Sequence, residues 1–135
     1  MRGQVSMEFM IFFGMLLIIT TFASVITITT TNRINNENTV RDAKTITRLA
    51  ATEINIAYEI GDGYSRTFYV KPILRDGSDY NLTILNQTIY LSWVGGTYLV
   101  PLLTHNITHN NLSDNFTLNK GNNTIRNVAR VLNIV

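Results

Sequence analysis

The chain has 135 residues, a formal net charge of only +2 and no cysteine. Its basic residues are scattered singly, which argues against a nucleic-acid surface, and the lack of cysteine excludes a disulfide framework and thiolate metal sites. The length suits one domain with an appendage.

The first element in the chain is an apolar segment, residues 9–32, which contains no charged side chain. A helix of about 20 residues spans the hydrocarbon core of a bilayer, so this segment can hold the protein in a membrane. Arg2 is the only basic side chain before it, which favours a cytoplasmic N-terminus and places the chain after Thr31 outside the cell.

A carboxylate, Glu8, stands directly before the apolar segment. A plain single-pass anchor explains the hydrophobicity but not this charge. A secretory signal peptide is the second alternative, with Arg2 as its basic end and cleavage after Ala23, and it leaves Glu8 as an oddity in a region that is normally basic.

The residues Gly3-Gln4-Val5-Ser6-Met7-Glu8-Phe9, followed by an apolar helix, resemble the class III (prepilin-type) leader of archaeal type IV pilin-like proteins. That pattern has a short basic leader ending in Gly, a Gln at the new N-terminus, a small hydroxyl residue two places later and a Glu at the fifth mature position. The resemblance implies a processing site between Gly3 and Gln4, cut on the cytoplasmic side by a membrane aspartyl protease. Residues 1–3 are then the leader, and the apolar segment stays on the mature protein.

The resemblance also gives Glu8 a role in assembly and register. In a fibre, the apolar helices bundle without lipid or water, where an unpaired carboxylate and the free amine at Gln4 are both costly. We expect each to neutralise the other across a subunit boundary, with an attraction of about 4 kcal/mol at about 4 Å before desolvation is subtracted. If Gln4 cyclises, the amine is lost and Glu8 needs a hydrogen-bond donor such as Ser6.

The helical pattern continues beyond the apolar segment. Gly61-Asp62-Gly63 supplies a stop, so one helix is expected over residues 4–60, with a bend or partial unwinding at the β-branched stretch Thr27–Thr31. Small and apolar residues recur at three- and four-residue spacing on one stripe of its second half: Val40, Ala43, Ile46, Ala50, Ile54 and Ala57.

Residues 61–135 are predicted to form a β-rich head domain, which makes the fold α+β: a long N-terminal helix, hydrophobic in its first half, followed by a small antiparallel sheet. Asn86-Gln87 and Gly95-Gly96 are two-residue turn signals, and His105 to Asn115 reads as a polar loop. We expect one antiparallel meander of five or six strands with the helix across one face. The expected strands are Tyr64–Val70, Tyr80–Leu85, Thr88–Val94, Thr97–Leu103, Phe116–Leu118 and Thr124–Val135.

Alternation predicts which strand faces are buried. Tyr80, Leu82 and Ile84 share one face, and Ile89, Leu91 and Trp93 share another. The aromatic residues Tyr90, Trp93 and Tyr98 are interpreted as strand-face packing rather than a sugar-binding platform.

The head contains six N-glycosylation sequons, each an Asn two places before Thr or Ser without an intervening proline. From Tyr80 to Val135 the chain has only four charged side chains but eleven Asn and seven Thr, so N-linked glycans would supply hydration that charge does not. Asn81 lies in a predicted strand and can instead face inward. The six acceptors are Asn81, Asn86, Asn106, Asn111, Asn115 and Asn122.

No constellation typical of an enzyme is present. His105 and His109 are the only histidines, spaced i, i+4, and we interpret them as part of a surface loop rather than a metal site. There is no Gly-rich phosphate loop and no plausible Ser/His/Asp arrangement. We therefore expect no enzymatic activity, no metal and no cofactor.

The resemblance implies a structural subunit (pilin) of an archaeal type IV-like adhesion pilus, located in the cytoplasmic membrane as a precursor and in the extracellular pilus when mature. The implied partners are copies of itself, a prepilin peptidase, an assembly ATPase and its membrane platform. The alternatives are a membrane-anchored surface glycoprotein or binding module that never polymerises, and a minor tip pilin.

Overall fold

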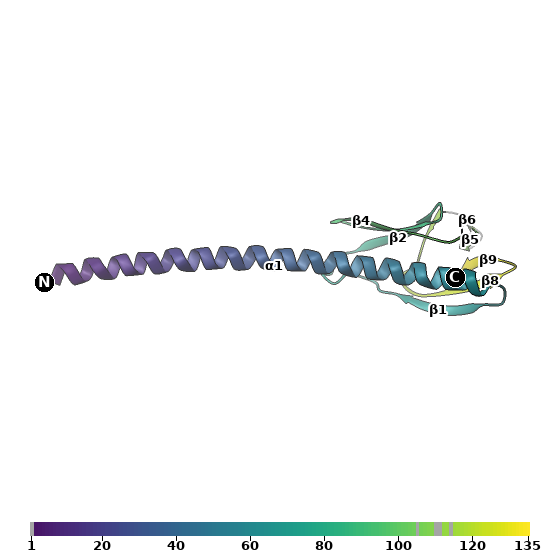
Figure 1. Ribbon diagram of the computed structural model, residues 1–135, viewed down its shortest axis with the longest axis horizontal. Helices are drawn as coiled ribbons and strands as arrows, with labels where there is room; N and C mark the ends of the chain where they lie inside the picture. The colour runs from purple at the N-terminus through teal and green to yellow at the C-terminus, as the bar shows by residue number, and fades with distance from the viewer. Residues whose placement is uncertain (1, 105, 110–111, 114) are drawn as a thin grey trace. The chain divides into compact units, whose positions relative to one another are not determined.

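The computed structural model describes residues 2–104, 106–109, 112–113 and 115–135, with side chains for residues 7–104, 106–109 and 115–135. The chain divides into two compact units, Met1–Glu37 and Asn38–Val135. One helix, α1 (Arg2–Ile60), contributes to both units, as the sequence predicted. Strands follow it along the chain, so the α+β class is confirmed (Figure 1).

Helix α1 stays helical through Thr27–Thr31, so the expected unwinding of this stretch was wrong. The threonine hydroxyls are accommodated by bonds to the backbone one turn earlier. Thr27 Oγ1 donates to the Ala23 carbonyl at 2.8 Å, and Thr29 Oγ1 to the Val25 carbonyl at 3.0 Å. These local bonds satisfy the hydroxyls inside a helix whose β-branched residues have low helix propensity.

The helix ends where the sequence predicted, at the Gly61-Asp62-Gly63 stretch. Gly61 and Gly63 have φ of 90° and 86°, a conformation that side chains disfavour. The backbone N–H of Gly63 then donates to the carbonyl of Asn127 at 3.0 Å, which directs the chain into the first strand.

The strands form two sheets rather than the single meander that the sequence predicted. One sheet has the order β1-β8-β9-β5-β6 and the other the order β4-β3-β2-β7. We refer to them as the five-stranded and the four-stranded sheet. Their bounds are β1 (Ser65–Val70), β2 (Tyr80–Leu85), β3 (Thr88–Trp93), β4 (Gly96–Pro101), β5 (Ile107–His109), β6 (Leu112–Ser113), β7 (Asn115–Thr117), β8 (Gly121–Val128) and β9 (Val131–Ile134).

The four-stranded sheet contains both predicted hairpins. Asn86 and Gln87 have φ of 45° and 61°, which is the conformation of a type I′ turn, and they connect β2 to β3. The turn between β3 and β4 is Val94-Gly95 and not the predicted Gly95-Gly96, because Gly96 already belongs to β4 and pairs with Trp93. Strand β7 adds to the other edge of β2.

The five-stranded sheet departs from the prediction in two places. The expected strand Thr124–Val135 is a hairpin of β8 and β9, because Ala129 and Arg130 adopt φ of 53° and 65°. The Ala129 N–H donates to Asp62 Oδ1 at 2.8 Å, so a long-range contact supports a turn without turn-forming residues. The expected polar loop contains β5 and β6, and β5 runs parallel to β9.

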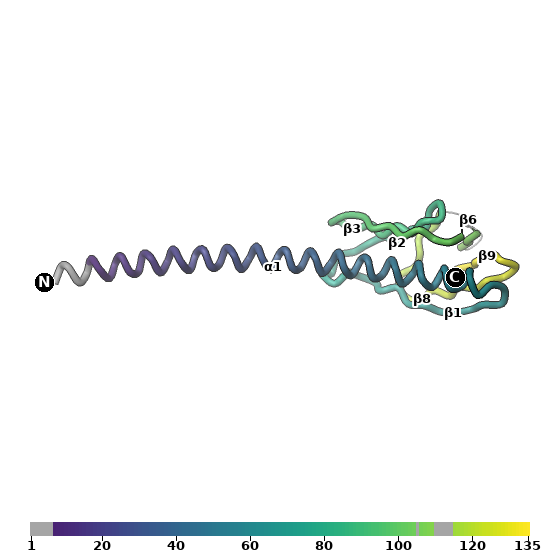
Figure 2. The backbone as a smooth tube through the Cα atoms, in the orientation of Figure 1, coloured from purple at the N-terminus to yellow at the C-terminus, as the bar shows by residue number. Residues whose placement is uncertain are grey.

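The core of the second unit is formed by the second half of α1 and both sheets. In Figure 1, β4 and β2 lie on one side of this half of the helix and β1 on the other, while the trace in Figure 2 shows β1 beside β8, its antiparallel partner. The predicted helical stripe is buried from Ala43 to Ala57, and Val40 is half-buried. Both predicted strand faces point inward, with Trp93 partly buried at the edge of the core.

Candidate functional site

The helix over residues 7–37 is exposed on all sides: every residue there is exposed except Gly14, which is half-buried. No other described element of the first unit packs against this stretch of helix. Large apolar side chains dominate this surface, among them Phe9 at 68%, Phe12 at 74% and Ile19 at 68% exposure. Apolar area of this extent requires lipid or another apolar protein surface.

Within the described residues, one helix is long and apolar enough to cross a membrane, and it is this one. Length and composition alone support that reading, and an N-terminal signal sequence would meet the same criteria. The rings of Phe9 and Phe13 stack at a centroid distance of 6.4 Å, one helical turn apart. A Cβ added at Gly14 would meet no atom within 4 Å, so the chain itself gives no reason for glycine there.

Glu8 is exposed at the N-terminal end of this apolar surface. The predicted processing residues Gly3 and Gln4 have helical backbone, and the side chains of Gln4 and Ser6 lie outside those that the structure describes. The geometry of a Glu8–Gln4 pair between subunits therefore stays a prediction.

The predicted glycosylation acceptors are spread over both sheets. Asn81, Asn86, Asn106, Asn115 and Asn122 are all exposed, whereas Asn111 lies outside the described residues. Asn81 faces outward from β2, so the inward alternative for it was wrong. Asn86 stands in the β2–β3 turn, and the side-chain amide of Asn106 donates to the Arg130 carbonyl at 3.3 Å.

No protein-family model, curated protein or solved structure matches this chain. Its function is therefore inferred from its own residues.

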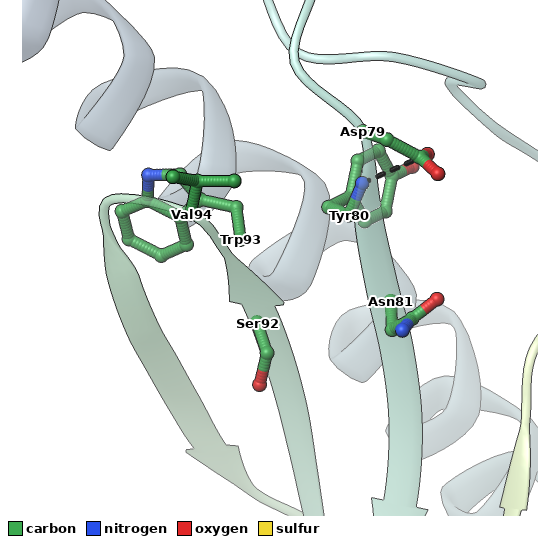
Figure 3. A pocket seen from close by; sticks show the side chains of 6 residues that line it. All are labelled: Asp79, Tyr80, Asn81, Ser92, Trp93 and Val94. Carbon is green, nitrogen blue, oxygen red and sulfur yellow. Dashed lines mark hydrogen bonds between the residues drawn. The ribbon is translucent and has the colours of Figure 1, made fainter.

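A shallow hollow of about 340 Å³ lies beside Asn81, where β2 and β3 run next to each other. Figure 3 shows the side chains of Asn81 and Ser92 on these neighbouring strands, with Trp93 and Val94 where β3 ends. Val94 is 99% exposed, which makes it the most exposed large apolar residue of the second unit that the structure describes.

Two ionisable groups at the edge of this hollow have shifted pKa values. A bond from the Lys120 ammonium to Asp79, together with one from the Tyr80 N–H at 2.9 Å, lowers the pKa of the Asp79 carboxyl. Burial, and next the negative charges of Asp42 and Asp79, raise the pKa of Tyr80 to about 12. The Tyr80 hydroxyl donates to the Lys71 carbonyl.

The histidine interpretation needs correction. His109 is not in a surface loop but is 9% exposed within β5, with Nδ1 at 2.7 Å from the Ile134 carbonyl and its ring stacked on Phe116 at 5.1 Å. A carbonyl only accepts, so Nδ1 carries the proton. His105 lies outside the described residues, and among the residues that the structure describes there is no group of three or more potential metal ligands.

The side chains of Tyr90, Trp93 and Tyr98 are half-buried, in line with strand-face packing. Tyr98 is covered by α1: the Lys44 ammonium lies 5.7 Å from its ring centroid, and Arg48 Nε donates to its hydroxyl at 3.2 Å. Tyr90 instead faces outward from β3, on the side opposite the buried Ile89 and Leu91.

Proposed function

We propose that this chain is a structural subunit of an archaeal type IV-like adhesion pilus that polymerises through its N-terminal apolar helix. One observation carries the proposal: helix residues 7–37 are exposed on all sides, whereas the second half of the same helix is already covered by its own sheets. The first stretch is thus free to bind copies of itself.

The exposed apolar surface suits both the membrane-bound precursor of a pilin and its assembled filament. In the cytoplasmic membrane, lipid covers the apolar segment of the precursor. After a prepilin peptidase cuts between Gly3 and Gln4, an assembly ATPase and its membrane platform would transfer the helix from lipid to a bundle of like helices. Lipid tails and apolar side chains offer similar surroundings, so packing and polar contacts decide this exchange.

Glu8 supplies the polar contact in this proposal. It is exposed at the start of the apolar surface, where its cost in a membrane is small because it lies near the interface. In a bundle of helices the carboxylate needs a partner, and the amine of Gln4 on a neighbouring subunit is the partner we propose. A helix inserted one turn out of register leaves both charges unmatched, which makes the pair a register device.

The head would form the outer surface of the filament, with N-linked glycans on some of its sequons. The five described acceptors are exposed, so each offers its side chain to solvent.

Two experiments test the proposal. N-terminal sequencing of the mature protein should begin at Gln4, whereas a start at Ser24 would mean an ordinary secreted glycoprotein. In cells, Glu8→Ala and Glu8→Gln should both abolish sheared surface filaments while the protein still accumulates in the membrane. Glu59→Ala is the matched control, because Glu59 is also an exposed carboxylate on the same helix. Wild-type levels of filament with Glu8→Ala would refute the assembly role.

A further inference from the structure

The outward face of the four-stranded sheet has no charged side chain among its described residues. Strand alternation assigns this face, which we call the outer face, and its centre is apolar or aromatic: Leu99 is 55% exposed, Leu85 is 36% exposed and Tyr90 is half-buried. The outer face consists of Thr97, Leu99 and Pro101 of β4, Thr88, Tyr90 and Ser92 of β3, Asn81, Thr83 and Leu85 of β2, and Asn115 and Thr117 of β7.

Two complete sequons stand on this same face. Asn81 and Thr83 both point outward from β2, and Asn115 and Thr117 both point outward from β7. The two threonines are cross-strand partners whose hydroxyls are 3.4 Å apart. The acceptors therefore lie on neighbouring antiparallel strands.

The strand register places each acceptor beside the uncharged surface. Asn115 is directly opposite Leu85, and such partners have Cβ atoms about 4.5–5.5 Å apart. Asn81 is opposite Ser92 and is therefore a diagonal neighbour of Tyr90, which is itself opposite Thr83. A first sugar on Asn115 would reach Leu85, and one on Asn81 would reach Tyr90 or the hollow beside Ser92.

We propose that the outer face is covered by the chain's own carbohydrate, with N-glycans on Asn81 and Asn115 lying over Leu85, Tyr90 and Leu99. The sugar would hydrate a surface without charges while its C–H faces pack on the aromatic and aliphatic side chains. This rests on the proposed glycosylation of the head but not on polymerisation.

The modification is a glycosyl transfer that a separate enzyme must catalyse. The side-chain nitrogen of Asn81 or Asn115 forms a bond to C1 of the sugar, and the bond from C1 to a phosphate oxygen of a glycosyl phosphate donor breaks. The amide loses one proton, the phosphate leaves with the electron pair, and nothing is oxidised or reduced. The donor is a lipid-linked or soluble glycosyl phosphate.

The first test is the intact mass of the mature protein from cells, extracted in detergent. Asn81→Gln and Asn115→Gln should each lose one glycan mass, and the double variant should lose two. Asn119→Gln is the control, because Asn119 is exposed but begins no sequon. Thr83→Val should lose the Asn81 glycan and Thr83→Ser should keep it. A wild-type mass without glycan, or unchanged glycan mass in both Gln variants, overturns the proposal.

The second test asks whether the sugar covers the face. The chain has no cysteine, so a single Leu85→Cys substitution reports on one position, and its labelling by a thiol reagent is measured on detergent-dispersed chains. Adding Asn115→Gln should speed labelling severalfold. Val128→Cys, on the five-stranded sheet and 62% exposed, should label at one rate in either background.

Equal rates with and without the Asn115 glycan would overturn the proposal. A different result would also overturn the proposal: Leu85→Cys is protected from labelling only in assembled filaments, and this protection persists without the glycan. A second copy of the chain would then cover the face. Wild-type protein that carries no glycan and still forms normal filaments would overturn this inference while leaving the proposed function standing. Loss of filaments in Glu8→Ala would count against the proposed function alone.

Discussion

The side-chain amide of Asn127 donates a hydrogen bond to the backbone carbonyl of Ala57 at 2.8 Å, which joins strand β8 to the last turn of helix α1. Asn127 is 1% exposed and Ala57 is fully buried, so water does not reach this contact. The bond satisfies a polar group near the end of a helix, where intrahelical partners run out. It also fixes where the five-stranded sheet meets the helix.

We expect Asn127→Leu to destabilise the chain by about 1–3 kcal/mol, because it leaves the Ala57 carbonyl without this donor in a buried place. Urea unfolding of the full chain in detergent, followed by circular dichroism, measures the change. Asn119→Leu, at an exposed position, should alter stability by less than about 0.5 kcal/mol. Equal effects of the two substitutions would contradict the role given to Asn127.

Substitutions at the centre of the helical stripe should also lower the stability of the fold. Ile54 is fully buried against the sheets, and Ile54→Ala is expected to cost about 2–5 kcal/mol through lost burial and a residual cavity. Leu49→Ala, on the same helix but 56% exposed, is the control and should cost far less. Thermal unfolding of both variants provides the comparison, and a small loss for Ile54→Ala would show that the helix is not packed as described.

We expect the chain to lose stability at alkaline pH, where Tyr80 ionises. Its pKa is raised to about 12 in the folded chain against 10.0 ordinarily, so the unfolded chain releases the proton first. The contribution of Tyr80 to the free energy of unfolding is complete below pH 10 and declines as the pH rises from 10 to 12. Urea midpoints measured across this range should fall less steeply in Tyr80→Phe than in the wild type; parallel curves would show that other groups cause the decline.

Two contacts of the His109 side chain, a hydrogen bond and a ring contact, should each stabilise the fold. His109→Phe keeps an aromatic ring against Phe116 but removes the donor to the Ile134 carbonyl, for an expected cost of about 1–3 kcal/mol. His109→Ala removes the ring as well and should cost more. Hydrogen exchange at the β9 amides reports the local effect, and unchanged exchange in both variants would argue against this contact.

Features determined by neighbouring residues were predictable from the sequence. The Asn86-Gln87 turn, the end of the helix at Gly61 and the burial of Leu82 and Leu91 all follow from local propensity or alternation. A single helix to Ile60 was also predictable, but the unwinding expected at Thr27–Thr31 was wrong, and the hydroxyls of Thr27 and Thr29 bond to backbone carbonyls within the helix.

Features determined by distant residues were missed. The Ala129-Arg130 turn has no turn-forming residue, and Asp62, far away in sequence, supports it. His109 looked like part of a polar loop because its strand is short and its parallel partner β9 follows much later. The uncharged outer face depends on the strand register, which the sequence pattern did not reveal.

For the candidate sites, the sequence supplied the residues and the structure supplied some of their surroundings. Glu8 and five of the six sequon asparagines are exposed, which each prediction requires. Cleavage at Gly3, pairing with Gln4 and attachment of sugar involve other molecules, so they remain predictions.

The two sheets differ in how far apart their strands lie along the chain. The hairpins of β2, β3 and β4 join consecutive segments. In contrast, Ser65 of β1 pairs with Arg126 of β8, and β5 pairs with β9, so these partners lie farther apart in the sequence. Closing such distant pairs is slow because loop entropy is lost before the contacts form. During synthesis, therefore, the side of the helix that the five-stranded sheet covers stays exposed to solvent until β8 and β9 form. A product truncated before Val131 would keep the hairpins of β2, β3 and β4 but would lack β9, so its core would stay incompletely buried.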